Sequence, residues 1–366
     1  MTPTLIADGA ALALAAEQLA RAPRLALDTE FMRERTYFAE LAFVQLADQE
    51  RIALVDPLVD MDLAPLTALL TAPGQLKVLH AARQDVEVLL PLTGAPLGPV
   101  LDTQLAAALL GCPPQIGYGD LVQRELGHTL EKGHARSDWT HRPLSAAQLT
   151  YAADDVRWLL PLAARLEEQL DALGRLDWLH EDLAQLADPG IYVLAPADAW
   201  QRFKAIEALP PQEQRRLRAL AAWREARAVR RNLPRGWVLT DDAARTIARA
   251  VPRDVAALRS LDIMPAGAVD KLGEEILAAL AEAGQLPLEG LVQRVEGRPS
   301  AAEQALMRAL SDRLKAVATG LGVAPEVMAP QRDLKRIARG ESVTQVLRGW
   351  RLAHLGAALE DVAGRG

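Results

Sequence analysis

Segments with the pattern of β-strands occur only in the first 80 residues of this chain, and this restricts its fold more than any other feature. Four short apolar runs are separated by turn-forming residues, a spacing typical of strands. The runs are Arg24–Asp28, Ala42–Leu46, Ile52–Val55 and Lys77–Leu79. Only the polar segment Asp48–Glu50 separates the second run from the third, so we expect these two strands to be adjacent and antiparallel.

Helical periodicity replaces the strand pattern after residue 80. Apolar residues recur at three- and four-residue steps in several segments, and Ser145 is a suitable N-cap for the longest of them. These segments are Arg83–Leu90, Asp102–Leu110, Asp120–Leu126 and Ser145–Leu173. Strands followed by interleaved helices predict one α/β domain over residues 1–190.

The remainder of the chain has only helical patterns. Asp188–Gly190 and Ala195–Asp198 are rich in turn-forming residues and indicate a linker. Helical segments follow at Leu217–Val229, Asp241–Ala250, Asp254–Arg259 and Val269–Ala283. A second polar break at Glu296–Ser300 precedes another helical set, so we predict all-helical domains over residues 209–290 and 300–366.

Bulk composition indicates a soluble protein of a reducing compartment. No apolar stretch approaches the ~20 residues needed to cross a bilayer. The first residues also lack the charged start and apolar run of a secretion signal. Cys112 is the single cysteine, which excludes an internal disulfide framework and argues against a zinc cluster. We therefore expect a cytoplasmic protein.

Charge is distributed unevenly along the chain. Residues 1–199 contain 14 basic and 28 acidic residues, whereas residues 200–366 contain 27 basic and 20 acidic residues. Arginine is densest between Arg215 and Arg259, where 12 arginines stand against four acidic residues. An acidic half joined to a basic half favours a nucleic acid or another charged ligand as partner. Arginine-rich helices are also common as solvated surfaces, so charge alone does not decide between these interpretations.

Asp28 and Glu30 are the strongest candidates for a metal site. A spacing of two residues at the end of a strand directs both side chains to the same face. Apolar residues stand on either side of the pair, and burying two acids there without a cation would be costly. The spacing alone is not specific, because it also occurs at Asp48/Glu50 and Asp85/Glu87.

Three further residues are candidates because of their positions in predicted helices. Asp85 lies near the start of the helix after the fourth strand, as a metal ligand or as an acid stabilised by the helix N-terminus. Tyr151 and Asp155 are four residues apart and share a helix face, as a catalytic pair or as a hydrogen-bonded core pair. Metal-assisted phosphodiester hydrolysis needs clustered carboxylates and a group that orients the attacking water.

The order of these motifs resembles the DEDD superfamily of 3′–5′ exonucleases, in its tyrosine-containing branch. The motifs that carry the resemblance are Leu27–Phe31 with its extension Met32–Tyr37, Val78–Asp85, and Tyr151–Val156. Two further segments, Leu101–Leu105 and Ser137–Ser145, are similar to the ribonuclease D family in particular. Each motif is weak alone, but their ordered combination over the whole α/β domain is specific.

The resemblance implies a ribonuclease-H-like mixed sheet with helices on both faces. The implied ligands of two divalent cations, Mg²⁺ or Mn²⁺, are four carboxylates: Asp28, Glu30, Asp85 and Asp155. Tyr151 is implied to orient or to help deprotonate the attacking water, and the ordinary tyrosine pKa near 10 favours orientation. Thr29 and His80 are implied to lie beside the terminal nucleotide.

The helical tail resembles an HRDC domain, a small nucleic-acid-binding module. The similarity rests on Leu217–Arg224, Arg227–Ala228, Asn232–Pro234, Asp241–Asp242, Ile247–Ala248 and Pro252. Trp223 is expected to anchor the core of this domain, which leaves nucleic-acid contacts to the surrounding arginines. Residues 300–366 resemble a second, degenerate copy in size and helical pattern.

These observations predict a 3′–5′ exoribonuclease that releases 5′-monophosphates from single-stranded 3′ ends. The resemblance suggests precursor transfer RNA as the substrate, and a monomer is the default state. A DNA exonuclease of the same superfamily would use the same chemistry, so the substrate class stays open. A catalytically silent RNA-binding scaffold is disfavoured, because all five expected catalytic residues are present.

Overall fold

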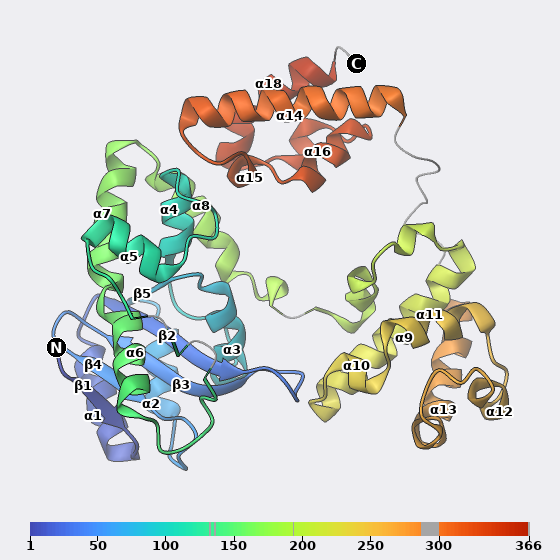
Figure 1. The fold of residues 1–366 in the computed structure, drawn as a ribbon, viewed down its shortest axis with the longest axis horizontal. Helices are drawn as coiled ribbons and strands as arrows, with labels where there is room; N and C mark the ends of the chain where they lie inside the picture. Colours follow the sequence, from blue (N-terminus) through green and yellow to red (C-terminus); the bar gives the residue numbers. More distant parts are fainter. Residues whose placement is uncertain (132, 135–136, 193, 287–299, 365–366) are drawn as a thin grey trace. The chain divides into compact units, whose positions relative to one another are not determined.

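The computed structural model describes residues 1–131, 133–134, 137–192, 194–286 and 300–364, and these form two compact units (Figure 1). The first unit contains Met1–Met32, Leu41–Tyr192 and Arg298–Gly366. The second contains Arg33–Glu40 and Val193–Gly297. No helix among the described residues is long and apolar enough to cross a membrane.

A mixed six-stranded sheet forms the centre of the first unit, in the order β1-β4-β3-β2-β5-β6. Its strands are β1 (Pro3–Ile6), β2 (Arg24–Met32), β3 (Glu40–Ala47), β4 (Ile52–Val55), β5 (Leu76–Leu79) and β6 (Val100–Asp102). β3 and β4 are antiparallel neighbours, as predicted, whereas β1 pairs parallel to β4 and β5 pairs parallel to both β2 and β6. The sequence pattern misses β1, because Pro3 and Thr4 leave no continuous apolar run there, and β6, because it has only three residues.

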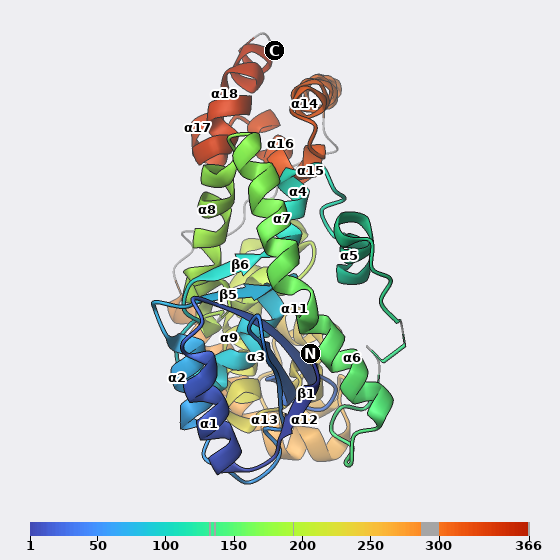
Figure 2. The same cartoon turned by 90° about the vertical axis from the view of Figure 1, so that its left-hand side faces the viewer.

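Successive residues of β2 face opposite sides of the sheet, and both sides are covered. Leu25 and Leu27 pack in one core with α1 (Gly9–Leu19), α2 (Ala64–Thr71) and α3 (Arg83–Thr93). Ala26 packs in another with α6 (Ala146–Arg157) and α7 (Leu159–Ala172). Figure 2 shows α1 and α2 on one side of the strands and α6 on the other. The two-residue period therefore places Asp28 and Glu30 on the α6 side.

The single helix predicted over Ser145–Leu173 is wrong, because the chain forms two helices that meet at Trp158. Pro161 is the cause: in a continuous helix its ring would clash with the carbonyl of Arg157. The predicted N-cap is confirmed, since the Ser145 side chain accepts a hydrogen bond from the backbone of Gln148 at 3.2 Å.

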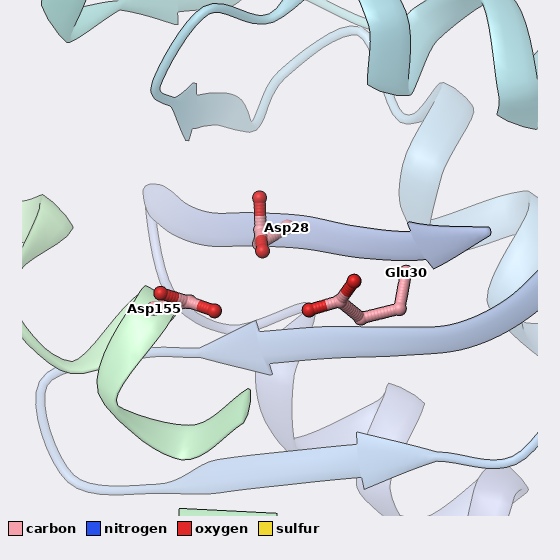
Figure 3. Close-up of side chains that lie close together, drawn as sticks. All are labelled: Asp28, Glu30 and Asp155. Carbon is pink, nitrogen blue, oxygen red and sulfur yellow. The ribbon is translucent and has the colours of Figure 1, made fainter. Parts of the chain in front are cut away.

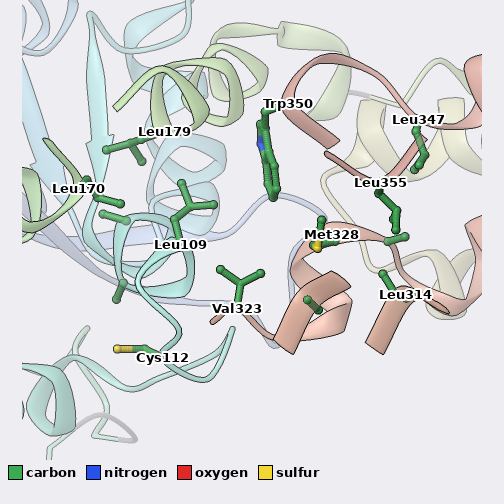
Figure 4. Close-up of a cluster of buried hydrophobic side chains, with 14 of the residues drawn as sticks. Leu109, Cys112, Leu170, Leu179, Leu314, Val323, Met328, Leu347, Trp350 and Leu355 are labelled. Carbon is green, nitrogen blue, oxygen red and sulfur yellow. The ribbon is translucent and has the colours of Figure 1, made fainter. Parts of the chain in front are cut away.

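The C-terminal helices share a hydrophobic core with helices of the α/β domain (Figure 4). The α/β domain contributes α4 (Thr103–Leu109), α5 (Tyr118–Leu126), α7 and α8 (Leu176–Ala184). The C-terminal segment contributes α14 (Ala301–Leu321), α15 (Pro325–Met328), α16 (Gln331–Ala338), α17 (Val343–Val346) and α18 (Gly349–Ala363). The C-terminal segment is thus folded against the α/β domain within one unit.

Trp350, at the start of α18, is central to this packing. Its ring stacks on Trp178 with a centroid separation of 4.5 Å and an interplanar angle of 2°. Its indole N–H donates to Asp182 Oδ1 at 3.2 Å, and Arg351 forms an ion pair with the same carboxylate. Gly349 has a φ of +54°, which favours glycine, and a Cβ there would lie 1.5 Å from Glu181 Oε1, so a larger residue would displace the Glu181 carboxylate.

The second unit is helical, apart from Arg33–Glu40, which joins β2 to β3. Two short 3₁₀ helices, η1 (Gln185–Ala187) and η2 (Pro189–Ile191), precede it. It contains η3 (Pro196–Arg202), η4 (Ile206–Ala208), α9 (Pro211–Arg231), α10 (Arg235–Val238), α11 (Asp241–Ala250), α12 (Val255–Arg259), α13 (Ala266–Glu282) and η5 (Ala283–Gln285). Trp223 packs against its core, as predicted, and its indole N–H donates to Glu275 at 3.0 Å.

Parts of the predicted domain boundaries lie outside the described residues. These are residues 287–290 of the first helical domain, residues 296–299 of the polar break, and residues 365–366.

Replacing Trp350 with Ala should lower the free energy of unfolding by ~3–5 kcal/mol, because a fully packed aromatic ring leaves a cavity. Urea denaturation measures this change, and limited proteolysis should then cut the C-terminal helices more rapidly. Trp237→Ala is the control, since Trp237 is 63% exposed and its loss should change stability by less than ~0.5 kcal/mol. Equal stability of the two variants would contradict the proposed packing.

Candidate active site

Asp28, Glu30 and Asp155 form a compact carboxylate cluster. One oxygen from each lies within 4.8 Å of the others. β2 supplies the first two residues and α6 supplies the third, and Figure 3 shows the side chains of Glu30 and Asp155 extending toward one another beside Asp28. Asp28 and Glu30 thus lie together, as their two-residue spacing predicts, and Asp155 from α6 joins them to make a group of three acids.

The pair Asp48/Glu50 has the same spacing but a different role. Asp48 Oδ1 accepts hydrogen bonds from the backbone of Glu50 at 2.7 Å and of Arg51 at 2.6 Å, so it stabilises its own turn. Glu50 is exposed to solvent. Asp48 and Glu50 therefore share the sequence spacing of Asp28 and Glu30 but, among the residues that the structure describes, are not part of a cluster of acids.

Asp85 lies in the first turn of α3, as predicted, and is almost fully buried. Thr29 Oγ1 donates a 2.6 Å hydrogen bond to its Oδ1. Asp85 is not part of the closest group of three, but its negative charge raises the pKa of both Asp28 and Glu30. It therefore contributes to the same electrostatic site.

The four carboxylates hold protons more tightly than ordinary acids do. Burial, followed by repulsion from the other three acids, raises the pKa of Asp28 well above its usual range. Burial, with repulsion from Asp155 and Asp85, raises the pKa of Glu30 to about 9. Burial raises the pKa of Asp85 and of Asp155 to about 7, although hydrogen bonds from Thr29 and Tyr151 oppose the shift.

No Lys or Arg side chain in the described part of the chain forms an ion pair with any of these four acids. Buried carboxylates are normally compensated by cationic partners or by bound metal ions. Oxygen ligands of this kind suit Mg²⁺ and Mn²⁺. The donor set thus fits divalent cations.

Tyr151 lies one helical turn before Asp155 and contributes a hydroxyl to the site. This hydroxyl is hydrogen-bonded to the Asp155 carboxylate. Burial and the nearby negative charge of Asp155 raise the pKa of Tyr151 above its usual value, so the hydroxyl keeps its proton at neutral pH. Tyr151 can therefore donate or share a hydrogen bond, and it is poorly suited to accept a proton as a base.

The Ser137–Ser145 motif fixes the chain that leads into α6. Arg142 Nη2 donates to Asp56 Oδ1 at 2.7 Å and to the carbonyl of Ala42 at 2.8 Å, which ties this segment to the sheet. Trp139 is buried with its ring centroid 6.0 Å from that of Tyr151. The motif thus holds the helix that carries Tyr151 and Asp155.

Asp102 fixes the start of α3 in a way that the sequence analysis did not identify. Its carboxylate accepts hydrogen bonds from the backbone of Ala81 at 3.0 Å, Ala82 at 2.9 Å and Gln104 at 2.8 Å. It is therefore the N-cap of α4 and also braces the turn before Asp85. The sequence could have indicated the cap of α4, because Asp102 directly precedes an apolar helical segment. It could not indicate the contacts with Ala81 and Ala82, which lie about twenty residues earlier in the chain.

Thr29 and His80, predicted to lie beside the terminal nucleotide, both make hydrogen bonds within the protein. Thr29 orients Asp85, as described above. The His80 ring nitrogens contact Thr103 Oγ1 and the carbonyl of Ile116, each at 2.9 Å. The structure therefore assigns both residues a positioning role, and their contact with a nucleotide stays a prediction.

Comparison with known proteins agrees with this architecture. Residues 3–171 match a family model described as 3′–5′ exonuclease, and residues 213–280 match the HRDC domain. The ribonuclease D of Gluconacetobacter diazotrophicus is 42% identical over 373 residues, which cover 98% of this chain and 93% of that protein. The ribonuclease D of Acidiphilium cryptum is 39% identical over 353 residues, covering 95% and 90%.

A solved structure is similar along the whole chain. The crystal structure of Escherichia coli RNase D, described as an exoribonuclease involved in structured RNA processing, superposes with a TM-score of 0.86 at 31% identity. The alignment covers 100% of this chain and 99% of that one. The ribonuclease-H-like mixed sheet followed by helical domains is thereby confirmed as the fold class. The chain belongs to the ribonuclease D family, and its α/β domain is a 3′–5′ exonuclease domain.

Proposed function

We propose that this enzyme hydrolyses the 3′-terminal phosphodiester of single-stranded RNA and releases nucleoside 5′-monophosphates one at a time. The observation that supports this most directly is the half-buried cluster of Asp28, Glu30 and Asp155, with the buried Asp85 beside it and with raised pKa values. Such a cluster is an arrangement for binding cations next to a phosphate. The ribonuclease D relatives support RNA as the substrate class.

Two divalent cations, Mg²⁺ or Mn²⁺, are the proposed cofactors, held by the same four carboxylates. When bound, such cations lower the pKa of a water molecule and stabilise negative charge on the leaving 3′ oxygen. The protein itself contributes the positions of the carboxylates. β2, α3 and α6 each fix one part of the set, and Thr29, Asp102 and Arg142 hold these elements by hydrogen bonds.

Tyr151 is proposed to orient the attacking water. Its hydroxyl stays protonated at neutral pH, and its bond to Asp155 keeps it at the edge of the cluster. Orientation of a nucleophile by a fixed hydrogen-bonding group accelerates attack without a full proton transfer to that group.

Precursor transfer RNA is the substrate that we propose, with the protein acting as a monomer. The similar Escherichia coli RNase D is involved in structured RNA processing, which supports a folded RNA with an unpaired 3′ end as the substrate here. A DNA 3′–5′ exonuclease is the second candidate, because the carboxylate cluster would perform the same chemistry on either sugar.

Individual replacement of the four carboxylates by Ala should abolish cleavage, because each loss disturbs cation placement. Tyr151→Phe should instead slow cleavage about 10²- to 10⁴-fold while leaving cation affinity nearly unchanged. Cleavage is measured on 5′-labelled RNA with an unpaired 3′ end, in Mg²⁺, Mn²⁺ and EDTA, beside a DNA oligomer of the same sequence. Cation affinity is measured by calorimetry on the same protein preparations.

Glu50→Ala is the matched control, since this acid has the same sequence spacing in an exposed turn and should keep full activity. A ladder that shortens from the 3′ end only with metal supports the proposal. Cleavage of DNA in preference to RNA would favour the second candidate. Loss of cation binding in Tyr151→Phe would show that Tyr151 is part of the metal site.

Asp28→Asn should stabilise the metal-free protein at alkaline pH. The four carboxylates have higher pKa values in the folded protein than in the unfolded chain. Their contribution to the free energy of unfolding is therefore fully present below about pH 4, and it is lost as the pH rises through the folded-state values of about 7 to about 9. In EDTA the variant should match the wild type near pH 4 and melt at least ~2 °C higher near pH 9. Differential scanning fluorimetry measures this difference.

The exposed Asp60→Asn replacement controls for loss of one negative charge and should give no such trend. In saturating Mg²⁺ the wild type should melt at a higher temperature than Asp28→Asn, because the wild type keeps all four metal ligands. A difference between Asp28→Asn and the wild type that does not change with pH would contradict the electrostatic account.

A further inference from the structure

The end of α9, the turn that follows it and the short helix α10 expose an unusual set of side chains. Trp237 is 63% exposed, although tryptophan is usually among the more buried residues. Val229 and Leu233, in the same stretch, are also exposed large apolar residues. Exposed apolar side chains concentrated in one place are typical of a binding surface.

The same segment is strongly basic. Residues 226–237 include four arginines and no acidic residue. Arg227 and Arg235 are ion-paired with Glu275 and Glu225. Arg230 and Arg231 are exposed, and neither forms an ion pair with an acid in the described part of the chain. Two guanidinium groups are therefore available to an anionic ligand.

A second exposed aromatic ring is held beside this turn. Asn232, the C-cap of α9 with a φ of +49°, accepts hydrogen bonds from the backbone N–H groups of Tyr37 and Phe38, each at 3.1 Å. The Tyr37 hydroxyl donates to the buried carboxylate of Glu225 at 2.5 Å. Phe38 packs edge-on against the Tyr37 ring, and 41% of its surface stays exposed.

We propose that Phe38, Arg230, Arg231 and Trp237 form an aromatic–arginine patch that binds single-stranded RNA, by base stacking on the rings and by phosphate pairing with the arginines. This inference rests on the proposed function, which supplies RNA as the ligand. It goes further by assigning the binding site to particular residues, among them two aromatic residues.

The composition of the patch favours single-stranded RNA over a folded protein partner. Unpaired bases stack on exposed aromatic rings, and each base is followed by a phosphate that a guanidinium group can bind. Protein interfaces instead place apolar residues in a core from which charges are depleted. Here the two arginines without ion pairs, Arg230 and Arg231, lie within eight residues of sequence that end at the exposed Trp237.

Binding is tested by fluorescence anisotropy of a labelled RNA about ten nucleotides long, within the ~4–16 nucleotides that such sites span. The full chain is used in EDTA, so that no cleavage occurs. Trp237→Ala should weaken binding about five- to hundred-fold, and Trp237→Phe should restore most of it. Arg230→Ala and Arg231→Ala should each reduce the slope of log affinity against log salt concentration by about 0.7.

Arg332→Ala is the control, because this arginine is exposed on the C-terminal helices and should not alter binding. Unchanged affinity in Trp237→Ala would overturn the proposal and would leave the patch to a protein partner. Cleavage by the wild-type enzyme in Mg²⁺ is measured separately. If the wild type binds as expected but does not cleave, the proposed function fails and the patch stands.

Discussion

Mutual repulsion among four carboxylates that are buried or half-buried is the constraint on which the rest of this structure depends. Asp28, Glu30, Asp85 and Asp155 come from three different elements, and without cations their pKa values are raised. A fold can keep such a group together only if other interactions fix each element. Thr29 provides this through a hydrogen bond to Asp85 itself, whereas the hydrogen bonds of Asp102 and Arg142 fix the elements from outside the charged group.

The distribution of charge along the chain follows from the same requirement. An acidic catalytic region repels the phosphate backbone of a nucleic acid, so affinity for RNA must be supplied elsewhere. The second unit contains the arginine-rich helix α9 and the exposed turn that follows it. We propose that catalysis and retention of the substrate belong to separate parts of one chain, while the C-terminal helices stabilise the first unit through a shared core.

Sequence patterns predict what depends on local periodicity and miss what depends on distant contacts. The two-residue period of β2 was sufficient to place Asp28 and Glu30 together, and the four-residue spacing placed Tyr151 beside Asp155. The break at Trp158 is invisible to periodicity, because the apolar residues continue at helical steps on both sides of it. The packing of α18 on α8 was missed because Trp350 and Trp178 are far apart in sequence, and the exposure of Trp237 has no signature in composition.

Calorimetric titration of the metal-free protein with Mn²⁺ tests the central claim most directly. Performed in two buffers of different ionisation enthalpy, it counts the protons that leave the protein as the cation binds. The raised pKa values predict net proton release at pH 7 and less release above about pH 9. Binding of Mn²⁺ without proton release, or with equal release at both pH values, would contradict a cluster whose carboxylates hold protons until cations replace them.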